Sequence, residues 1–330
     1  MPILFLIILI VMAVVLYGIS VHLYNLTIST VYRNEPPDDP EKKTDNSHFS
    51  RSSNQKTKER SYAGPDGNDK THCQNQRYYF DTHKTEDIYM QSRDSLMLHG
   101  TAVINDRSRW VIICHGYSST ARQMSSYAEL FDELGFSVLA VDLRGHGESE
   151  GTYRGMGWHD SYDVWDWSCL LEKRYKARDI ILFGISMGGA TVMMAAGHAL
   201  PESVKGVIED CGYSSVKAEL KYSMKKRYHL PSFPLLNMAS FVTKRRAGYS
   251  LLTDGDAAAQ LRLTKLPVLF IHGEDDKFVP FAMMSKVYKA ASGPKMKFTV
   301  AGAGHGKSYS ADPDGYRDAV YSFLYKYIRI

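Results

Sequence analysis

The sequence predicts an α/β fold: a mostly parallel β-sheet with helices on both faces and a small helical insertion, preceded by one transmembrane helix. Two observations lead to this fold class. From Asp87 onward, short apolar runs typical of buried strands alternate with helical patterns, and such alternation implies parallel strands covered by helices. The N-terminus carries one long apolar run, with no Asp, Glu, Lys or Arg from Ile3 to Tyr24.

The N-terminal apolar run is long enough to cross a membrane. As a helix it measures about 33 Å, which exceeds the ~30 Å hydrocarbon core of a bilayer. We therefore expect residues 1–25 to form a single-pass membrane anchor. A cleaved signal peptide is the alternative, because Gly18-Ile19-Ser20 resembles a cleavage site, although no basic region precedes the run.

A polar segment, residues 26–85, follows the apolar run. It contains Pro36-Pro37 and many Ser, Asn, Lys and Asp residues, and it has too few large apolar side chains to fold alone. We expect a flexible tether whose end packs on the next domain through Tyr78-Tyr79-Phe80. The basic residues near the apolar run all follow it: Arg33, Lys42 and Lys43. By the positive-inside rule this favours a cytoplasmic domain, although the side of the membrane stays open.

Residues 86–330 are enough for one α/β domain with a large core. The first two expected strands follow each other closely and predict an antiparallel start to the sheet. The net charge of +4 is mild and mixed along the chain, so it does not indicate nucleic-acid binding, and the oligomeric state stays open. Strands are expected near 87–92, 97–104, 110–114, 137–141, 179–183, 203–208, 267–271 and 297–300. Helices are expected near 120–134, 160–175 and 189–196.

The most informative motif is Gly184-Ile185-Ser186-Met187-Gly188, which lies between an expected strand and an expected helix. A strand that turns at once into a helix forces the residue at the turn into a strained backbone conformation and exposes its side chain. Glycines two residues away on either side avoid collisions within such a turn. The motif therefore predicts that Ser186 is a nucleophile.

An acid and a base follow in the chain, each after an expected strand. Asp276 follows the strand at 267–271, and His305 follows the strand at 297–300. The carboxyl ends of parallel strands meet at one edge of the sheet, so these residues and Ser186 are expected to lie together. The order serine, acid, histidine predicts a catalytic triad. Two other carboxylates are alternative acids: Asp210 and Asp275.

Another strand end supplies a candidate oxyanion hole. The strand at 110–114 leads into His115-Gly116-Tyr117. The backbone N–H groups of Tyr117 and of Met187, which follows the nucleophile, are expected to donate to a developing oxyanion. Backbone donors suit this role because they are fixed before the reaction starts.

Over roughly residues 86–330 the sequence resembles the α/β-hydrolase superfamily. It is similar to bacterial membrane-anchored hydrolases related to serine aminopeptidase-like and monoacylglycerol lipase-like enzymes. The H-G-x-x-D-x-x-V-P pattern that starts at His272 matches the superfamily at the acid position and favours Asp276. The resemblance also rests on these stretches: His115–Ser119, Asp142–Gly151, Gly157–Asp160, Gly184–Thr191, Glu209–Tyr213 and Gly302–His305.

The resemblance implies a serine hydrolase that cleaves a carboxylic ester, thioester or related acyl bond through an acyl-enzyme. It implies a small-molecule or lipid-like acyl substrate and no cofactor. An aminopeptidase-like amide hydrolase is the nearest alternative. A catalytically inactive hydrolase fold that serves as a binding module is another.

The strand–helix alternation breaks at about residues 214–266, where α/β-hydrolases carry a lid. This segment is apolar and rich in proline around Leu230–Leu236, and it carries two basic runs, Lys225-Lys226-Arg227 and Lys244-Arg245-Arg246. Two interpretations remain open. The segment contacts lipid head groups or an anionic substrate, or it is a small helical cap with solvated basic faces.

The four cysteines do not predict a disulfide scaffold or a metal site. Cys114 and Cys211 are expected on either side of the strand at 179–183, about 9.6 Å apart, which is too far for a disulfide. No Cys-x-x-Cys spacing occurs, so free thiols are expected. The run Ala301–Ser308 fits a relaxed phosphate-binding loop, but only a short segment follows it, so nucleotide binding is the weaker alternative.

Overall fold

The computed structural model describes residues 2–31 and 78–329, so residues 32–77 of the expected tether lie outside the described residues. The described part contains an eight-stranded sheet in the order β1-β2-β4-β3-β5-β6-β7-β8. β1 pairs antiparallel with β2, and β2 with β4, while the remaining neighbours are parallel. The predicted fold class and its antiparallel start are thereby confirmed. The strands are β1 Thr85–Gln91, β2 Met97–Val103, β3 Arg109–Cys114, β4 Ser137–Val141, β5 Asp179–Ile185, β6 Val204–Asp210, β7 Val268–Gly273 and β8 Lys295–Val300.

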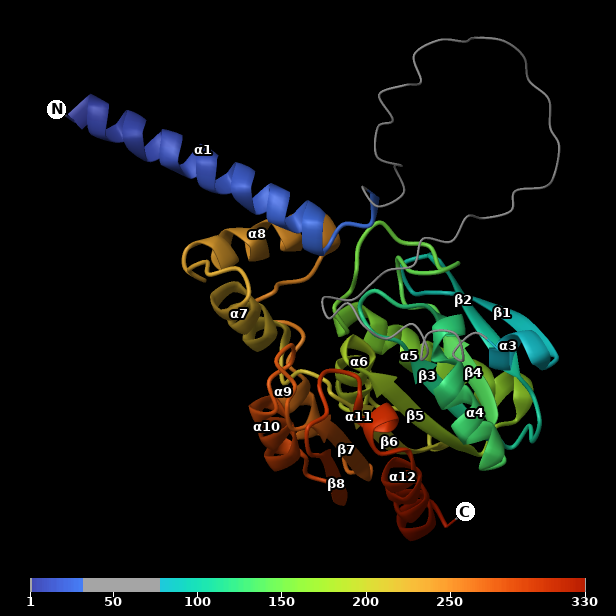
Figure 1. The fold of residues 1–330 in the computed structure, drawn as a ribbon. Coiled ribbons are helices and arrows are strands. Elements are labelled where there is room, and N and C mark those ends of the chain that lie inside the picture. The colour runs from blue at the N-terminus through green and yellow to red at the C-terminus, as the bar shows by residue number, and fades with distance from the viewer. Residues whose placement is uncertain (1, 32–77, 330) are drawn as a thin grey trace, which may run out of the picture.

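Helices cover both faces of this sheet, as Figure 1 shows. α3, α4 and α12 pack on one face, where Val111 is buried, and α5, α6, α9 and α10 pack on the other, where Ile112 is buried. Adjacent residues join different clusters because strand side chains alternate between the faces. The helices are α3 Tyr78–Thr82, the 3-10 turn η2 Ala121–Met124, α4 Ser125–Glu133, α5 Trp158–Leu170, the π-helical turn η3 Leu171–Tyr175, α6 Met187–Ala195, α9 Ala257–Leu261, α10 Ala282–Ala290, α11 Ser308–Ala311 and α12 Pro313–Ile328.

The ends of the expected strands differ from the observed ones by at most two residues. The helices differ more. The helix expected at 160–175 ends at Leu170 and continues as a π-helical turn. The helix expected at 189–196 begins at Met187, because the chain leaves β5 and turns into α6 at a single residue, Ser186.

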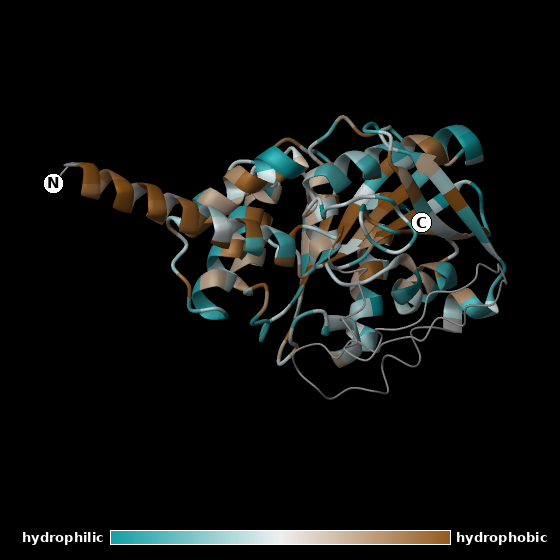
Figure 2. Ribbon diagram, turned by 90° about the horizontal axis from the view of Figure 1, so that it is seen from above, coloured by the Kyte–Doolittle hydropathy of each residue, from teal (hydrophilic) through white to brown (hydrophobic). Residues whose placement is uncertain are grey.

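α1 (Pro2–Thr27) leaves the domain as a long apolar helix, which is mostly brown toward its N-terminus in Figure 2. Large apolar side chains between Ile3 and Ile19 are exposed along it. By length and composition this helix can cross a membrane, and a signal sequence would meet the same criteria. The expectation of an apolar N-terminal helix long enough to span a bilayer is therefore confirmed.

The C-terminal end of α1 packs against the domain instead of leading into a free tether. Ser20, Tyr24 and Ile28 recur at intervals of four residues, and all three are buried. Such spacing places them on one face of the helix. α8 (Leu235–Ala247) contacts α1, and Figure 1 shows the two helices side by side.

The chain immediately after α1 is hydrogen-bonded to the domain. The backbone N–H of Thr30 donates to the carbonyl oxygen of Thr152 at 3.0 Å, and the N–H of Arg154 donates to the carbonyl of Ile28 at 2.8 Å. We expected a flexible tether over residues 26–85, but at the start of that range Ile28 and Thr30 are hydrogen-bonded to the domain. The apolar face of α1 continues past residue 25 and docks there.

The other end of the expected tether is also ordered. α3 places Tyr79 and Phe80 in the core beside α4, so the expectation that this aromatic run packs on the domain is confirmed for these two residues. The hydroxyl of Thr82 donates to the carbonyl of Tyr79 at 3.1 Å.

The insertion near residues 214–266 is helical, as expected. Its first two helices, α7 (Val216–Lys226) and α8, follow each other in the chain and are joined by a short loop, and we call residues 216–247 the lid hairpin. The side chain of Ser215 caps α7 by accepting a hydrogen bond from the N–H of Ala218 at 3.1 Å. α9 then returns the chain to the sheet and packs against α6.

Candidate active site

Ser186 occupies the single-residue turn between β5 and α6. Its backbone has φ 57° and ψ −115°, a conformation that costs a non-glycine residue about 1–3 kcal/mol and must be held by its surroundings. The N–H of Ser186 donates to the carbonyl of Asp210 at 2.7 Å, and its carbonyl accepts from the N–H of Ala190 at 3.0 Å. These bonds fix the serine at the carboxyl end of the sheet.

The two glycines of the motif are required by contact with backbone atoms. A Cβ on Gly184 would lie 2.1 Å from the carbonyl oxygen of Gly188, and a Cβ on Gly188 would lie 2.0 Å from that of Cys114. Both distances are well inside van der Waals contact, and backbone atoms cannot rotate away. The elbow can therefore close only with glycine at both positions.

The structure brings His305 between Ser186 and Asp276. Its Nε2 lies 2.8 Å from the Ser186 Oγ, and its Nδ1 lies 2.7 Å from Oδ2 of Asp276. An ionised carboxylate only accepts, so Nδ1 carries the proton and Nε2 is free to accept from the serine hydroxyl. This is the tautomer in which an imidazole can act as a base toward serine.

Asp276 is held by donors on both carboxylate oxygens. Oδ1 accepts from the N–H groups of Phe278 at 2.8 Å and Val279 at 2.9 Å. Oδ2 accepts from His305 and lies 3.2 Å from Nε2 of His272. Burial alone would raise the pKa of Asp276, but hydrogen bonds from His272 and His305 lower that pKa to about 2. The carboxylate is therefore ionised at neutral pH.

The two alternative acids lie elsewhere. Asp210 is buried and accepts a hydrogen bond from the hydroxyl of Tyr316 at 3.2 Å, and burial raises the pKa of Asp210 to about 6. Asp275 is exposed, and its backbone N–H donates to the carbonyl of Ala303. Of the three candidates, the structure places Asp276 on Nδ1 of His305.

An aromatic ring from the loop after β7 and a cation from the lid hairpin lie over His305. The ring of Phe278 stacks on the imidazole with centroids 4.7 Å apart and an interplanar angle of 19°. The guanidinium of Arg227, at the end of α7, lies 3.7 Å above the Phe278 ring. Sequence reasoning missed both contacts, because nothing in the local pattern places Arg227 near His305.

His272 is a further residue at the site whose role was missed. It is fully buried at the end of β7, and its Nε2 lies 3.0 Å from the carbonyl of Val279 and 3.2 Å from Asp276 Oδ2. Burial alone would lower the pKa of His272, but the hydrogen bond to Asp276 and the charge of Glu209 raise this pKa overall. The H-G-x-x-D spacing was the available signal, since it places a histidine four residues before the acid.

Tyr117, the first expected oxyanion donor, is fixed from several directions. The preceding glycine lies next to Ser186, because a Cβ on Gly116 would be 3.6 Å from the Cβ of Ser186. Nε2 of His146 lies 2.7 Å from the carbonyl oxygen of Tyr117, and Arg154 lies 4.7 Å above its ring. Met187, the second expected donor, is the first residue of α6 and directly follows Ser186.

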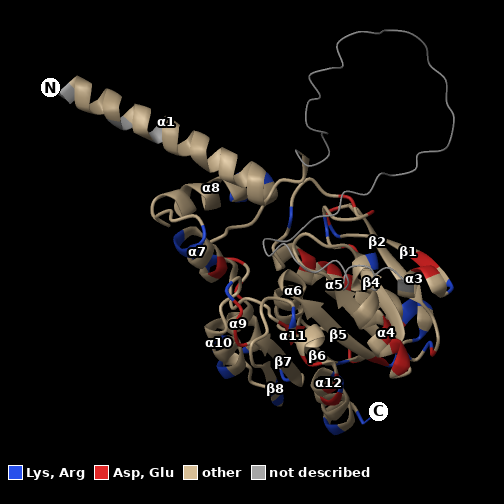
Figure 3. Cartoon of the chain, viewed as in Figure 1, with Lys and Arg blue, Asp and Glu red and all other residues tan. Residues whose placement is uncertain are grey.

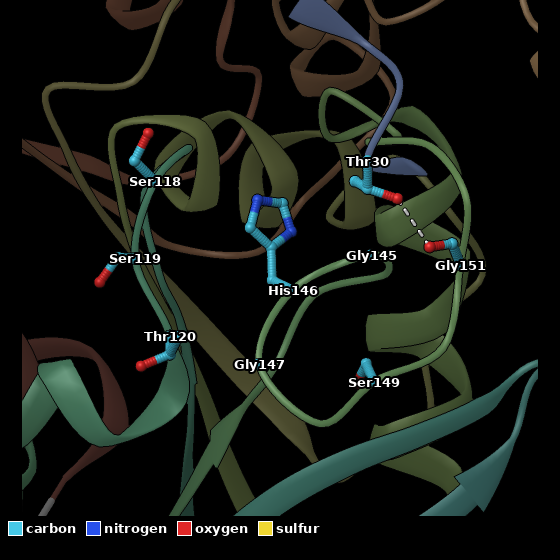
Figure 4. A pocket seen from close by; sticks show the side chains of 9 residues that line it. All are labelled: Thr30, Ser118, Ser119, Thr120, Gly145, His146, Gly147, Ser149 and Gly151. Carbon is cyan, nitrogen blue, oxygen red and sulfur yellow. Dashed lines mark hydrogen bonds between the residues drawn. The ribbon is translucent and has the colours of Figure 1, made fainter. Parts of the chain in front are cut away.

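A polar pocket of about 240 Å³ lies beside this loop (Figure 4). His146 stands at its centre, and the Thr30 hydroxyl closes one side by donating to the carbonyl of Gly151 at 2.8 Å. The segment that follows α1 thus lines a pocket next to Tyr117. The lining residues are Thr30, Ser118, Ser119, Thr120, Gly145, His146, Gly147, Ser149 and Gly151.

Three possible metal donors lie close together at the site. The ligand atoms of Cys211, Asp276 and His305 are within 4.8 Å of one another. Asp276 and His305 already bond to each other, and burial raises the pKa of the Cys211 thiol well above its usual range, so this thiol stays protonated. Both ring nitrogens of His305 already have partners, Asp276 and Ser186, so the arrangement fits a hydrogen-bonded group of side chains better than a metal centre.

Comparison with known proteins gives relatives along most of the domain. A family model described as serine aminopeptidase, S33, matches residues 105–230. The uncharacterized protein YqkD of Bacillus subtilis is 33% identical over 221 residues, which cover 67% of this chain and 72% of YqkD.

Solved structures share the fold at low sequence identity. The esterase Pf2001 of Pyrococcus furiosus aligns with a TM-score of 0.61 and 21% identity, covering 75% of this chain and 92% of that one. The α/β hydrolase GrgF of a Penicillium species aligns with a TM-score of 0.58 and 17% identity, covering 75% of this chain and all of GrgF, at 100%. With its sheet order, its elbow and these relatives, the chain belongs to the α/β-hydrolase superfamily.

Proposed function

We propose that this protein is a serine hydrolase that cleaves a carboxylic ester or a related acyl bond through an acyl-enzyme, and that α1 attaches it to a membrane. The observation that carries the proposal is the pair of short hydrogen bonds that link Ser186 to His305 and His305 to Asp276. Membership of a hydrolase superfamily supports the same reaction class.

In the proposed reaction, Ser186 Oγ attacks the substrate carbonyl and passes its proton to Nε2 of His305. The imidazolium that forms is stabilised by the Asp276 carboxylate, which stays ionised. The N–H groups of Tyr117 and Met187 donate to the oxyanion. His305 then protonates the leaving alcohol, and the C–O bond to the leaving group breaks. Water attacks the acyl-enzyme with His305 again as base, which releases the acid and restores Ser186.

The substrate is proposed to be a small-molecule or lipid-like acyl compound. α1 is long and apolar enough to span a bilayer, so a domain docked on its end works next to lipid. An amide is the second candidate, because the matching family model is described as a serine aminopeptidase. A panel of p-nitrophenyl esters and aminoacyl p-nitroanilides separates the two by kcat/KM, and higher values for the amides would replace the ester proposal.

Labelling with a fluorophosphonate tests the nucleophile directly. We expect the full-length protein to be labelled at Ser186, and the Ser186→Ala variant to be folded but unlabelled. Labelling that persists without Ser186 would refute the assignment. A wild-type protein that is folded, unlabelled and inactive on every substrate would instead support a binding module.

A further inference from the structure

We propose that the lid hairpin docks on the head-group layer of an anionic bilayer and holds the active site against it. This inference rests on the proposed attachment through α1, and it does not depend on the chemistry of the triad. Three observations carry it: the contact between the hairpin and α1, the charge of the hairpin, and its exposed apolar side chains.

The contact with α1 sets the height of the hairpin relative to a bilayer. Exposed side chains run along α1 from Ile3 to Val15, a stretch of about 20 Å, before Leu16 packs against the core. About two thirds of the hydrocarbon core is therefore filled before the docked face begins. α8 packs on that docked face. Arg246 lies 5.4 Å above the ring of Tyr24, with Nη1 3.4 Å from Oδ1 of Asn25. The hairpin therefore lies where α1 leaves the membrane.

The exposed charge of the hairpin is positive, because its one acidic residue, Glu219, is buried. No Asp or Glu occurs from Leu220 to Thr253, although the whole chain carries 36 acidic residues against 40 basic ones. Seven Lys and Arg side chains lie in this stretch, all are exposed, and among the described residues none of them forms a salt bridge. Figure 3 shows blue residues on α7 and at one end of α8. They are Lys221, Lys225, Lys226, Arg227, Lys244, Arg245 and Arg246.

Apolar side chains are exposed among these cations. Phe233, in the loop between α7 and α8, is 75% exposed, and Phe241 on α8 is 52% exposed. Tyr228 and Leu230 are also exposed in the same loop. Aromatic and aliphatic side chains mixed with Lys and Arg are typical of surfaces that lie in the lipid interface. A neighbouring acidic protein would match the charge, but the contact with α1 favours the bilayer.

The hairpin also reaches the active site. Arg227 at the end of α7 lies on Phe278, which in turn stacks on His305. A hairpin bound to head groups would thus hold the covering of His305 at the membrane surface. The proposed site would then face the ester groups of membrane lipids, which lie just below the head groups.

Tryptophan quenching by brominated lipid tests this arrangement. The full-length protein carrying Ser186→Ala, so that no lipid is hydrolysed, is reconstituted into vesicles of phosphatidylcholine brominated near the head group, with or without phosphatidylglycerol. Phe233→Trp reports on the hairpin. Tyr321→Trp is the matched control, because Tyr321 is 54% exposed on α12, which lies far from α1 in Figure 1. Both signals are read against the protein without an added tryptophan.

We expect at least twofold quenching of Phe233→Trp in vesicles with phosphatidylglycerol, little in phosphatidylcholine alone, and none for Tyr321→Trp. Replacing Lys244, Arg245 and Arg246 by glutamine should abolish the quenching. The same change at Arg262, Lys286 and Lys289, which are exposed outside the hairpin, should not. The proposal would be overturned if Phe233→Trp were not quenched in anionic vesicles. It would also be overturned if the quenching were the same with and without phosphatidylglycerol and in the variant with glutamine at Lys244, Arg245 and Arg246. Neither result depends on whether Ser186 is catalytic.

Discussion

Replacing Asp276 with asparagine separates the stability of the site from its proposed chemistry. The pKa of Asp276 is about 2, below its ordinary value of 3.8, and this depression corresponds to about 2 kcal/mol of stability. Because the folded pKa is the lower one, the contribution is complete above about pH 4 and is lost as the pH falls through 2. We expect Asp276→Asn to be about 2 kcal/mol less stable at pH 7, with the difference shrinking toward pH 2.

Turnover should fall much further than stability. The N–H groups of Phe278 and Val279 point at Oδ1, so the carbonyl oxygen of an asparagine would take that position and its NH₂ would face His305. Nδ1 of His305 must then accept, which moves the ring proton to Nε2. An Nε2–H cannot take the proton of Ser186, so kcat should fall on the order of 10⁴-fold at neutral pH.

The measurements are denaturant unfolding at pH 7 and at pH 3, and kcat on a soluble p-nitrophenyl ester. Asp275→Asn is the control, because that neighbouring carboxylate is exposed, and it should change kcat less than about threefold. A kcat for Asp276→Asn within tenfold of wild type would refute the reasoning. So would a larger loss for Asp210→Asn than for Asp276→Asn.

Three further substitutions test other parts of the site. Ser186→Ala should lower kcat for ester hydrolysis on the order of 10³-fold or more. Its unfolding midpoint, measured by circular dichroism, should equal that of the wild type within error. Turnover comparable to that of the wild type would contradict the assignment of Ser186 as the nucleophile. His272→Phe keeps a ring but removes a hydrogen-bond donor to Asp276, which should raise the pKa of that carboxyl. The midpoint of acid unfolding should therefore move to higher pH, and an unchanged midpoint would contradict the idea that His272 stabilises the Asp276 carboxylate. Ile28→Ala empties a buried position and should cost about 2–4 kcal/mol in denaturant unfolding, whereas a change below about 0.5 would show that the end of α1 does not dock.

The central strands of the sheet were predictable because they are buried on both faces. Val111, Ile112 and Ile113 on β3 are all fully buried, so the strand appears in the sequence as a short continuous apolar run. The triad candidates were predictable for a related reason: each follows such a run, and parallel strands bring their carboxyl ends to one edge. Both features are local in sequence and need no knowledge of distant contacts.

The remaining parts of the site depend on contacts between distant segments. The stack of Arg227 on Phe278 joins the lid hairpin to the loop after β7, and no local pattern encodes it. The docked face of α1 was hidden in another way. Ser20, Tyr24 and Ile28 lie at one-turn spacing, but within a uniformly apolar run such spacing does not distinguish a face that meets protein from one that meets lipid.

The docking of α1 changes what the N-terminal segment does for the proposed enzyme. A helix joined through a long polar tether would only raise the local concentration of a self-sufficient domain. Instead, the hydroxyl of Tyr117 donates to the carbonyl of Thr27, and Arg154 donates to the carbonyl of Ser29 at 3.1 Å while lying on the Tyr117 ring. A chain beginning at Tyr78 would lose these contacts along with α1. The loop proposed to hold the oxyanion thus contacts the end of α1, so the proposed membrane attachment and the proposed catalysis would share residues.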